Sequence, residues 1–153
     1  MALDDLYREI ILEHFRSPRN KGRLDNPDVF AEGVNPLCGD EVCLGLALLG
    51  DRVQEVRVEG HGCSISQASC SMMSEAIKGR TLAEVEGLAQ AFKGQMLGGE
   101  PADPAVDLGD LEALEGVKQF PVRIKCALLA WNTLLGGLAS RAHGEREVKL
   151  VEE

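Results

Sequence analysis

The sequence predicts a single α+β domain in which several helices pack against one face of a small, three-stranded antiparallel sheet. Three strand-like segments come early in the chain and helical segments follow them, an order that is typical of this class. The 153 residues, 44% of them hydrophobic and 27% charged, match one globular domain. Because only 4% of the residues are aromatic, we expect a mainly aliphatic core.

The first half of the chain contains one helix and the strands. Apolar residues at steps of three and four predict a helix that begins at residue 3 and ends at Ser17-Pro18. Strand-like segments follow at about 28–34, 41–49 and 52–60. Gly50-Asp51, between the last two, is a two-residue hairpin signal, so we expect these two strands to pair antiparallel.

The second half of the chain is predicted to be helical. Ser64 or Ser66 is the expected cap of the first of these helices. Thr81 and Glu84 form a capping box for the next, and Pro121 stands in the first turn of the last. Helices are expected at residues 64–79, 81–97, 107–119 and 120–142, with a linker at 98–104 and a mobile tail from about residue 144.

The net charge and the apolar runs of the chain indicate which partners are not expected. A net charge of -9, from 25 acidic and 16 basic residues, argues against a nucleic-acid or anionic-membrane surface. No apolar run approaches the roughly 20 residues of a membrane span. The N-terminal MALDDLYREI also lacks the basic and then apolar pattern of a secretion signal. We therefore expect a cytoplasmic protein with no nucleic-acid and no membrane partner.

The five cysteines fall into two groups. An odd number of cysteines without a secretion signal argues against a disulfide framework and favours metal ligands or reactive thiols. Cys38, Cys63 and Cys126 lie at element boundaries, beside turn residues or near helix starts, where free N–H groups stabilise thiolates. Cys43 falls in an apolar strand and Cys70 on the apolar stripe of a helix, so we expect both in the core.

Asp40, two residues after Cys38, adds a carboxylate to the three boundary cysteines. Three thiolates and one carboxylate are a reasonable zinc set, in which the harder oxygen ligand is the natural one to exchange. Their combined negative charge would favour nearby cations, and Arg123 and Lys125 lie next to Cys126 in the sequence.

The residues by themselves leave a plainer interpretation open. Without a CxxC pair the cysteine spacing is a weak metal signal. Arg123 and Lys125 are equally compatible with a solvated helix face. We expect His14 and His143 to be surface or packing residues, whereas the role of His61, between two glycines, stays open.

Three motifs taken together resemble a known family. NPLCGD (35–40), GHGCSISQASCSMM (60–73) and FPVRIKCALLAW (120–131) are similar, in order, to the three cysteine motifs of iron–sulfur cluster assembly scaffolds of the IscU/NifU N-terminal type. The likeness begins at LYREIILEHFRSPRNKG and runs over nearly the whole chain. It implies an α+β fold with a three-stranded antiparallel sheet. It also implies a metal site whose ligands are Cys38, Asp40, Cys63 and Cys126.

Two departures from the usual scaffold favour one branch of this family. The usual scaffold has a histidine immediately before its third cysteine, where this chain has Lys125. The segment between Cys63 and Cys126 is also longer here. Both features are similar to the SufU branch, which implies a zinc-dependent sulfurtransferase that works with a cysteine desulfurase.

The resemblance implies a role for each site residue. Cys38 would accept sulfur from a persulfide of the desulfurase, and Asp40 would be the exchangeable ligand beside it. Arg123 would stabilise the released thiolate, with Lys125 as a second cation near the ligands. Other iron–sulfur assembly proteins or apo-protein acceptors would be further partners. Two alternatives stay open: a scaffold that assembles iron or a [2Fe–2S] cluster on the same ligands, and a module whose zinc is purely structural.

Overall fold

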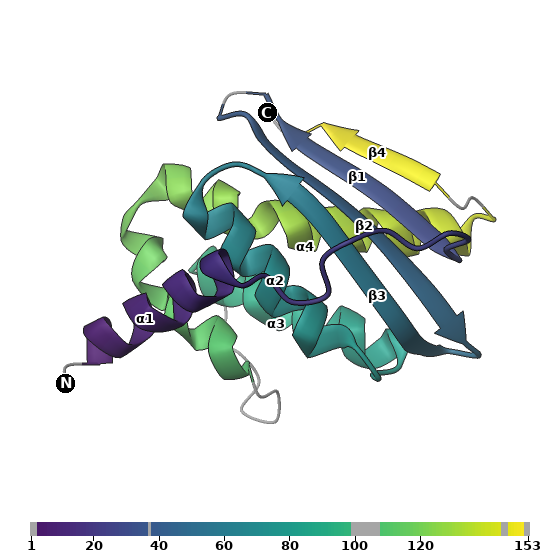
Figure 1. Ribbon diagram of the computed structural model, residues 1–153, viewed down its shortest axis with the longest axis horizontal. Helices are drawn as coiled ribbons and strands as arrows, with labels where there is room; N and C mark the ends of the chain where they lie inside the picture. The colour runs from purple at the N-terminus through teal and green to yellow at the C-terminus, as the bar shows by residue number, and fades with distance from the viewer. Residues whose placement is uncertain (1–2, 37, 99–107, 145–146, 152–153) are drawn as a thin grey trace.

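The computed structural model describes residues 3–36, 38–98, 108–144 and 147–151 (Figure 1). Its helices and strands follow one another along the chain in the order α1 (Leu3–Arg16), β1 (Val29–Asn35), β2 (Asp40–Leu49), β3 (Arg52–His61), α2 (Ser64–Ile77), α3 (Leu82–Met96), the 3-10 helix η1 (Gly109–Gln119), α4 (Pro121–Ala142) and β4 (Glu147–Val151). In the part of the chain that is described, no helix is both long and apolar enough to cross a membrane.

The sheet has four strands in the order β3-β2-β1-β4 (Figure 1). β2 pairs antiparallel with β1 and with β3, whereas β4 lies parallel to β1. The prediction of a three-stranded antiparallel sheet is therefore wrong in the number of strands and in the direction of one of them. The fourth strand comes from the segment that was predicted to be a mobile tail.

β4 forms because the rest of the fold offers it an edge and a surface. β1 would otherwise be an edge strand with a row of unpaired N–H and C=O groups, which β4 hydrogen-bonds. A Cβ at Gly136 of α4 would come within 2.6 Å of Leu150 Cδ1, so the bare glycine lets the two elements pack closely. Val148 and Leu150 also alternate with Glu147 and Lys149, a strand pattern that the prediction of a mobile tail overlooked.

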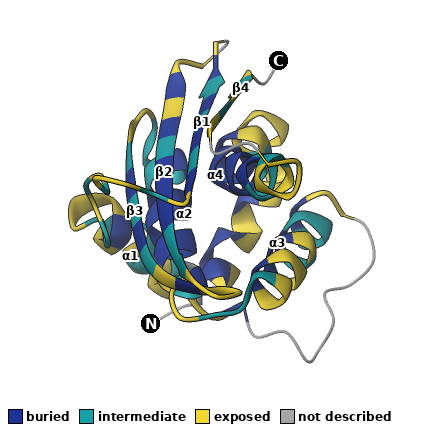
Figure 2. Ribbon diagram, turned by 90° about the vertical axis from the view of Figure 1, so that its right-hand side faces the viewer, coloured by how far each residue is buried: buried dark blue, intermediate teal, exposed yellow. Residues whose placement is uncertain are grey.

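The core lies between the sheet and the helices. Alternate residues of each strand face the helices, as Val42, Leu44 and Leu46 of β2 do, and all three are nearly inaccessible to solvent. The buried side of α4 is turned toward the sheet in Figure 2. Phe92 of α3 and Trp131 of α4 pack with ring centroids 5.2 Å apart. The other large side chains that are fully buried are Leu, Ile and Met, which confirms the predicted aliphatic core.

Most of the predicted elements are confirmed. Gly50 has φ +64°, as a two-residue hairpin turn requires, and Leu49 pairs directly with Arg52. The capping box of Thr81 and Glu84 is present at the start of α3. The predicted short acidic helix is a 3-10 helix, η1. Most of the predicted linker, from residue 99 onward, lies outside the described residues.

Candidate metal centre

The boundary cysteines and Asp40 meet at one end of the sheet. Asp40 is the first residue of β2, and the antiparallel pairing of Glu41 with His61 places the end of β3 beside it. Cys63 follows two residues after that end, beyond Gly62, and is the N-cap of α2. Cys126 belongs to the second turn of α4. One strand start and two helix starts therefore converge, as the sequence predicts.

Asp40 is the centre of this arrangement. Its side chain is 1% exposed. One carboxylate oxygen, Oδ1, accepts a hydrogen bond of 2.9 Å from the backbone N–H of Cys63. The other, Oδ2, lies 3.2 Å from the Sγ atom of Cys38 and 3.8 Å from that of Cys63. The carboxylate thus holds the start of α2 in place with one oxygen and faces the thiols with the other.

The glycine turn before Cys63 makes room for this carboxylate. Gly62 has φ +144°, in a region that side-chain-bearing residues rarely adopt. A Cβ at this position would lie 2.8 Å from Asp40 Cγ. Gln67, with its amide turned to suit its neighbours, donates to the Gly60 carbonyl at 3.2 Å and accepts from the His61 N–H at 3.0 Å. Asp40 on one side and Gln67 on the other therefore hold the turn in place.

Cys63 itself is the N-cap of α2. Its backbone is extended, with φ -71° and ψ 165°, and its Sγ accepts from the Ser66 N–H at 3.5 Å. The prediction that Ser64 or Ser66 caps this helix is wrong, because the sulfur takes the position that a serine oxygen usually fills. The Ser66 N–H, which has no backbone partner within the helix, thus points at the sulfur of Cys63.

Cys38 and Cys126 differ sharply in exposure. Cys126 is 1% exposed, and its thiol donates to the Val122 carbonyl at 3.6 Å. Cys38 is exposed and stands on the turn between β1 and β2, where the Gly39 N–H donates to the Asn35 carbonyl at 2.8 Å. The site therefore has one accessible thiol on a turn and one buried thiol in a helix.

Three donor atoms lie close enough to one another to share a metal ion, and the sulfur of Cys63 lies beside them. One ligand atom each from Cys38, Asp40 and Cys126 lie within 4.8 Å of one another, and Cys63 Sγ contacts the same carboxylate. Donors placed about 2.0–2.3 Å from a common tetrahedral centre are separated by roughly 3.3–3.8 Å. The observed separations of 3.2 Å and 3.8 Å from Asp40 Oδ2 match that spacing. Three sulfurs and one carboxylate oxygen are a set that suits Zn²⁺.

The electrostatics of the site favour a neutral Cys126 thiol and a charged Arg123 guanidinium. Burial, together with the nearby Asp40 and Cys63, raises the pKa of the Cys126 thiol. Interaction with Cys126 and the charge of Cys63 raise the pKa of the Arg123 guanidinium. Arg123 therefore lies beside the sulfurs, as its spacing from Cys126 predicts. Lys125 is exposed on the same first turns of α4.

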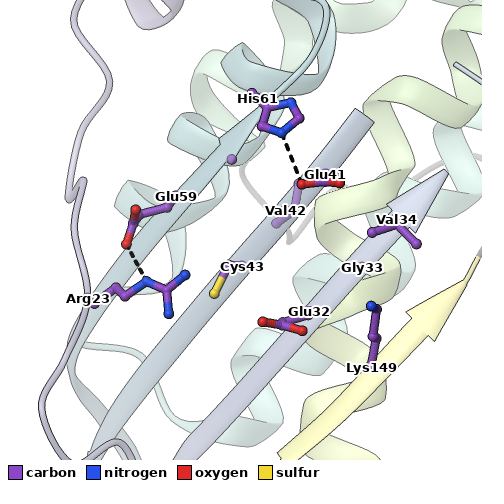
Figure 3. A pocket seen from close by; sticks show the side chains of 11 residues that line it. Arg23, Glu32, Gly33, Val34, Glu41, Val42, Cys43, Glu59, His61 and Lys149 are labelled. Atoms are coloured by element: carbon purple, nitrogen blue, oxygen red, sulfur yellow. Dashed lines mark hydrogen bonds and ion pairs between the residues drawn. The ribbon is translucent and has the colours of Figure 1, made fainter. Parts of the chain in front are cut away.

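The remaining cysteines lie away from the site. Cys70 is buried in the core of α2, as predicted, and burial raises its pKa to about 12. Cys43 is not a core residue, so this prediction is wrong. It lies between Val42 and Leu44, which face the helices, and its side chain therefore points to the opposite face of the sheet. Figure 3 shows its sulfur on that face, near the ion pair of Arg23 and Glu59, which are 2.7 Å apart.

The histidines do not join the donor set within the described residues. His14 is buried and packs between helices, with Nδ1 2.8 Å from Ser71 Oγ and Nε2 3.0 Å from Asp110 Oδ2. His61 is largely exposed and pairs with Glu41 at 3.0 Å (Figure 3). His14 is thus a packing residue, as predicted. His61 is the last residue of β3 and pairs with Glu41, so it serves the strand end before the glycine turn.

An open groove adjoins the site. It has a volume of about 1090 Å³ and is lined by residues of α1, the Cys38 turn, α2, η1 and α4, among them Tyr7, Cys38, Ile65, Phe120, Arg123 and Cys126. Phe120 and Val122 at the start of α4 are 59% and 70% exposed, which is unusual for such apolar side chains. The accessible thiol therefore stands at the wall of a partly apolar groove.

Two residues near the ligands have features that the sequence did not indicate. Nothing in GHGC marks Gly62 as the glycine that Asp40 requires, because the two residues belong to different strand ends. Ser66 has a fully buried hydroxyl oxygen with no hydrogen-bond partner, although it lies only three residues after Cys63. The signal that could have found Ser66 is its place at the third position after the N-cap.

Comparison with known sequences agrees with this geometry. A family model described as the NifU-like N-terminal domain matches residues 6–127. The zinc-dependent sulfurtransferase SufU of Bacillus subtilis (strain 168) is 47% identical over 142 residues, which cover 93% of this chain and 95% of that protein. The iron–sulfur cluster assembly scaffold protein IscU of Streptococcus pyogenes serotype M1 is 36% identical over 143 residues, 94% of this chain and 89% of that protein.

Solved structures share the fold. FiSufU from the thermophile Fervidobacterium islandicum AW-1 has a TM-score of 0.81 at 39% identity, covering 90% of this chain and 99% of that chain. A NifU-like protein (N-terminal) from Brucella abortus has a TM-score of 0.80 at 25% identity, covering 92% and 97%. The matched family model and these relatives extend over most of the chain, including the first two cysteine motifs and Cys126. The chain therefore belongs to the family of NifU-like N-terminal domains.

Proposed function

We propose that this chain is an iron–sulfur cluster assembly protein of the SufU type that binds zinc and accepts persulfide sulfur at Cys38 from a cysteine desulfurase. The observation that carries the proposal is the contrast within the donor set. Cys38 is exposed on a turn, whereas Asp40 and Cys126 are each 1% exposed. One sulfur can therefore meet a partner while the buried donors hold the site together.

Cys38, Asp40, Cys63 and Cys126 are the proposed zinc ligands. The two sulfur separations from Asp40 Oδ2, 3.2 Å and 3.8 Å, support this assignment, and the relative in Bacillus subtilis is named as zinc-dependent. Bound zinc would keep the ligand thiols deprotonated at neutral pH. Asp40 supplies the hard oxygen ligand, the one most suited to exchange, while its other oxygen stays bonded to the Cys63 N–H.

The sulfur-transfer step is a displacement at sulfur. The Cys38 thiolate attacks the terminal sulfur of the donor persulfide, so that a new S–S bond forms on Cys38. The S–S bond of the donor breaks at the same time, and the donor cysteine leaves as a thiolate. No external oxidant or reductant is required. Arg123, beside the sulfurs, stabilises the negative charge that moves between them.

The groove beside Cys38 is the proposed place for the desulfurase. Tyr7, Ile65 and Phe120 give it apolar walls, and Arg123 gives it a cation next to the thiols. An exposed apolar surface rimmed by polar groups is typical of a protein interaction site. A persulfide carried on an extended segment of the partner can reach Cys38 from this side, while Cys126 lies deeper.

Metal analysis and a transfer assay test the proposal. The purified chain should contain about one zinc per molecule, and a stoichiometry near zero would contradict the metal centre. In a mixture with cysteine desulfurase and cysteine, trapped persulfide should map to Cys38 by peptide mass. Cys38→Ser should abolish the transfer, whereas the control Cys43→Ala should keep it. Persulfide found mainly on Cys126 would refute the assignment.

The alternative function is a scaffold for a [2Fe–2S] cluster on the same four residues, as the name of the Streptococcus pyogenes relative suggests. Reconstitution with iron and sulfide separates the two. A stable cluster that passes to an apo-protein, in a chain that accepts no persulfide, would favour the scaffold. A chain that holds zinc but neither accepts sulfur nor forms a cluster would be a structural zinc module.

A further inference from the structure

Ser66 is an exception among the buried hydroxyl groups that are described. Its Oγ atom is inaccessible to solvent and has no hydrogen-bond partner. By contrast, Ser69 donates to the Ala127 carbonyl at 2.6 Å, Ser74 to the Ser71 carbonyl at 2.7 Å, and Thr133 to the Leu129 carbonyl at 2.7 Å. Because a buried hydroxyl without a partner is costly, the Ser66 hydroxyl calls for an explanation.

The position of Ser66 in α2 points its side chain toward the metal centre. Ser66 is the third residue after the N-cap Cys63, and its own N–H already donates to Cys63 Sγ. Side chains of a helix lean toward its N-terminus, so the hydroxyl is directed at the turn that carries Cys63. The carbonyl four residues earlier belongs to Gly62, outside the helix. Ser66 therefore lacks the acceptor that Thr133 finds within its own helix.

The neighbouring turn of α2 shows what this side of the helix faces. Ser69, one turn after Ser66, donates to the carbonyl of Ala127, the residue next to Cys126. Residues three apart lie on the same side of a helix. The stripe that includes Ser66 and Ser69 thus faces the early turns of α4, and Ser66 is at the end of the stripe nearer to Cys63.

We propose that the Ser66 hydroxyl donates a hydrogen bond to the Cys63 thiolate in the metal-bound site, and so positions this ligand. A neutral thiol is a weak acceptor, whereas a thiolate is a strong one. In the structure the hydroxyl is not bonded to this sulfur, so the Ser66 side chain must turn toward Cys63 Sγ, and the charge of the thiolate favours that turn. The inference rests on the proposed metal centre, but it does not depend on sulfur transfer. Hydrogen bonds to metal ligands commonly change affinity by about 10–100-fold.

Cobalt(II) substitution of the full-length chain tests this role. In Ser66→Ala we expect about tenfold weaker Co²⁺ binding. We also expect the thiolate-to-cobalt charge-transfer band to move to lower energy, because the sulfur loses its donor. The metal-free variant should unfold at the wild-type Tm or above it, since the unpaired hydroxyl is gone. Ser66→Thr, which keeps a hydroxyl, should return the band toward its wild-type position.

Ser69→Ala is the matched control, because it removes a buried hydroxyl of the same stripe that is bonded to a carbonyl instead. It should lower the Tm of the metal-free chain and leave the band unmoved. Wild-type affinity and band position in Ser66→Ala would overturn the proposal, as would an affinity loss matched by a lower Tm without metal. A wild-type chain that binds no Co²⁺ would overturn the metal centre and this inference together. Failure of sulfur transfer alone would leave the inference standing.

Discussion

Replacing Gly62 by alanine should disrupt the centre of the metal site, because two physical demands meet at this residue. The backbone has φ +144°, a conformation that is nearly restricted to glycine. The new Cβ would also collide with the Asp40 carboxyl group, whose Cγ would lie 2.8 Å away. Asp40 is buried, so it cannot move aside without breaking its hydrogen bond to the Cys63 N–H.

The magnitude follows from these two effects. A non-glycine residue in this backbone region costs about 1–3 kcal/mol. Loss of a hydrogen bond to a charged acceptor costs about 1.5–3 kcal/mol. We therefore expect Gly62→Ala to lower the free energy of unfolding of the metal-free chain by roughly 2.5–6 kcal/mol, a large share of the stability of a typical domain.

Urea unfolding of the metal-free protein measures this change, and Gly79→Ala is the matched control. Gly79 also has a positive φ, +84°, but a Cβ there would meet nothing within 4 Å. The free energy of unfolding of this control should fall by only about 1–2 kcal/mol, the cost of the backbone conformation alone. At a slope of about 2 kcal/mol per molar urea, the midpoint of Gly62→Ala should lie roughly 1.5 M lower than that of the control, taking the middle of each range. Equal midpoints would refute the reasoning that the Asp40 contact requires glycine.

Three further predictions concern the core, a helix cap and the site. Burial raises the Cys70 pKa from 9.0 to about 12, so only the unfolded chain loses this proton between those pH values, and stability should fall as pH rises. By pH 11 the free energy of unfolding should have fallen by about 2.5 kcal/mol. Urea unfolding in the presence of a reductant should show a smaller fall in Cys70→Ala. Thr81→Ala removes half of a capping box and should cost about 1 kcal/mol in the same assay; an unchanged midpoint would contradict it. Arg123→Ala should slow persulfide acceptance about tenfold with zinc content unchanged, and the control Lys125→Ala should slow it less; equal effects would argue against a specific role for the guanidinium.

Local signals made most of the fold predictable. The apolar periodicity of α1 and α2, the Gly50-Asp51 turn and the capping box at Thr81 each depend on residues a few positions apart. β4 was missed although Val148 and Leu150 alternate with charged residues, because five residues near the end of the chain form a strand only when a distant one, β1, pairs with them. Cys43 was misplaced for a similar reason: its strand is apolar on average, and only the sheet decides which face is covered.

The sequence by itself determined the chemistry that this chain carries: three boundary cysteines, an aspartate beside the first and an arginine one turn before the last. Their positions beside turn residues and helix starts made them candidates, and the likeness of the three motifs to a known family supplied the ligand set. Only the tertiary structure decided how these residues meet. The antiparallel pairing of β2 and β3 brings Asp40 to the Cys63 N–H, and the packing of α2 on α4 brings Ser69 to Ala127. Exposure of Cys38, burial of Cys126 and the unpaired hydroxyl of Ser66 are likewise properties of packed elements, because they depend on residues that are distant in sequence.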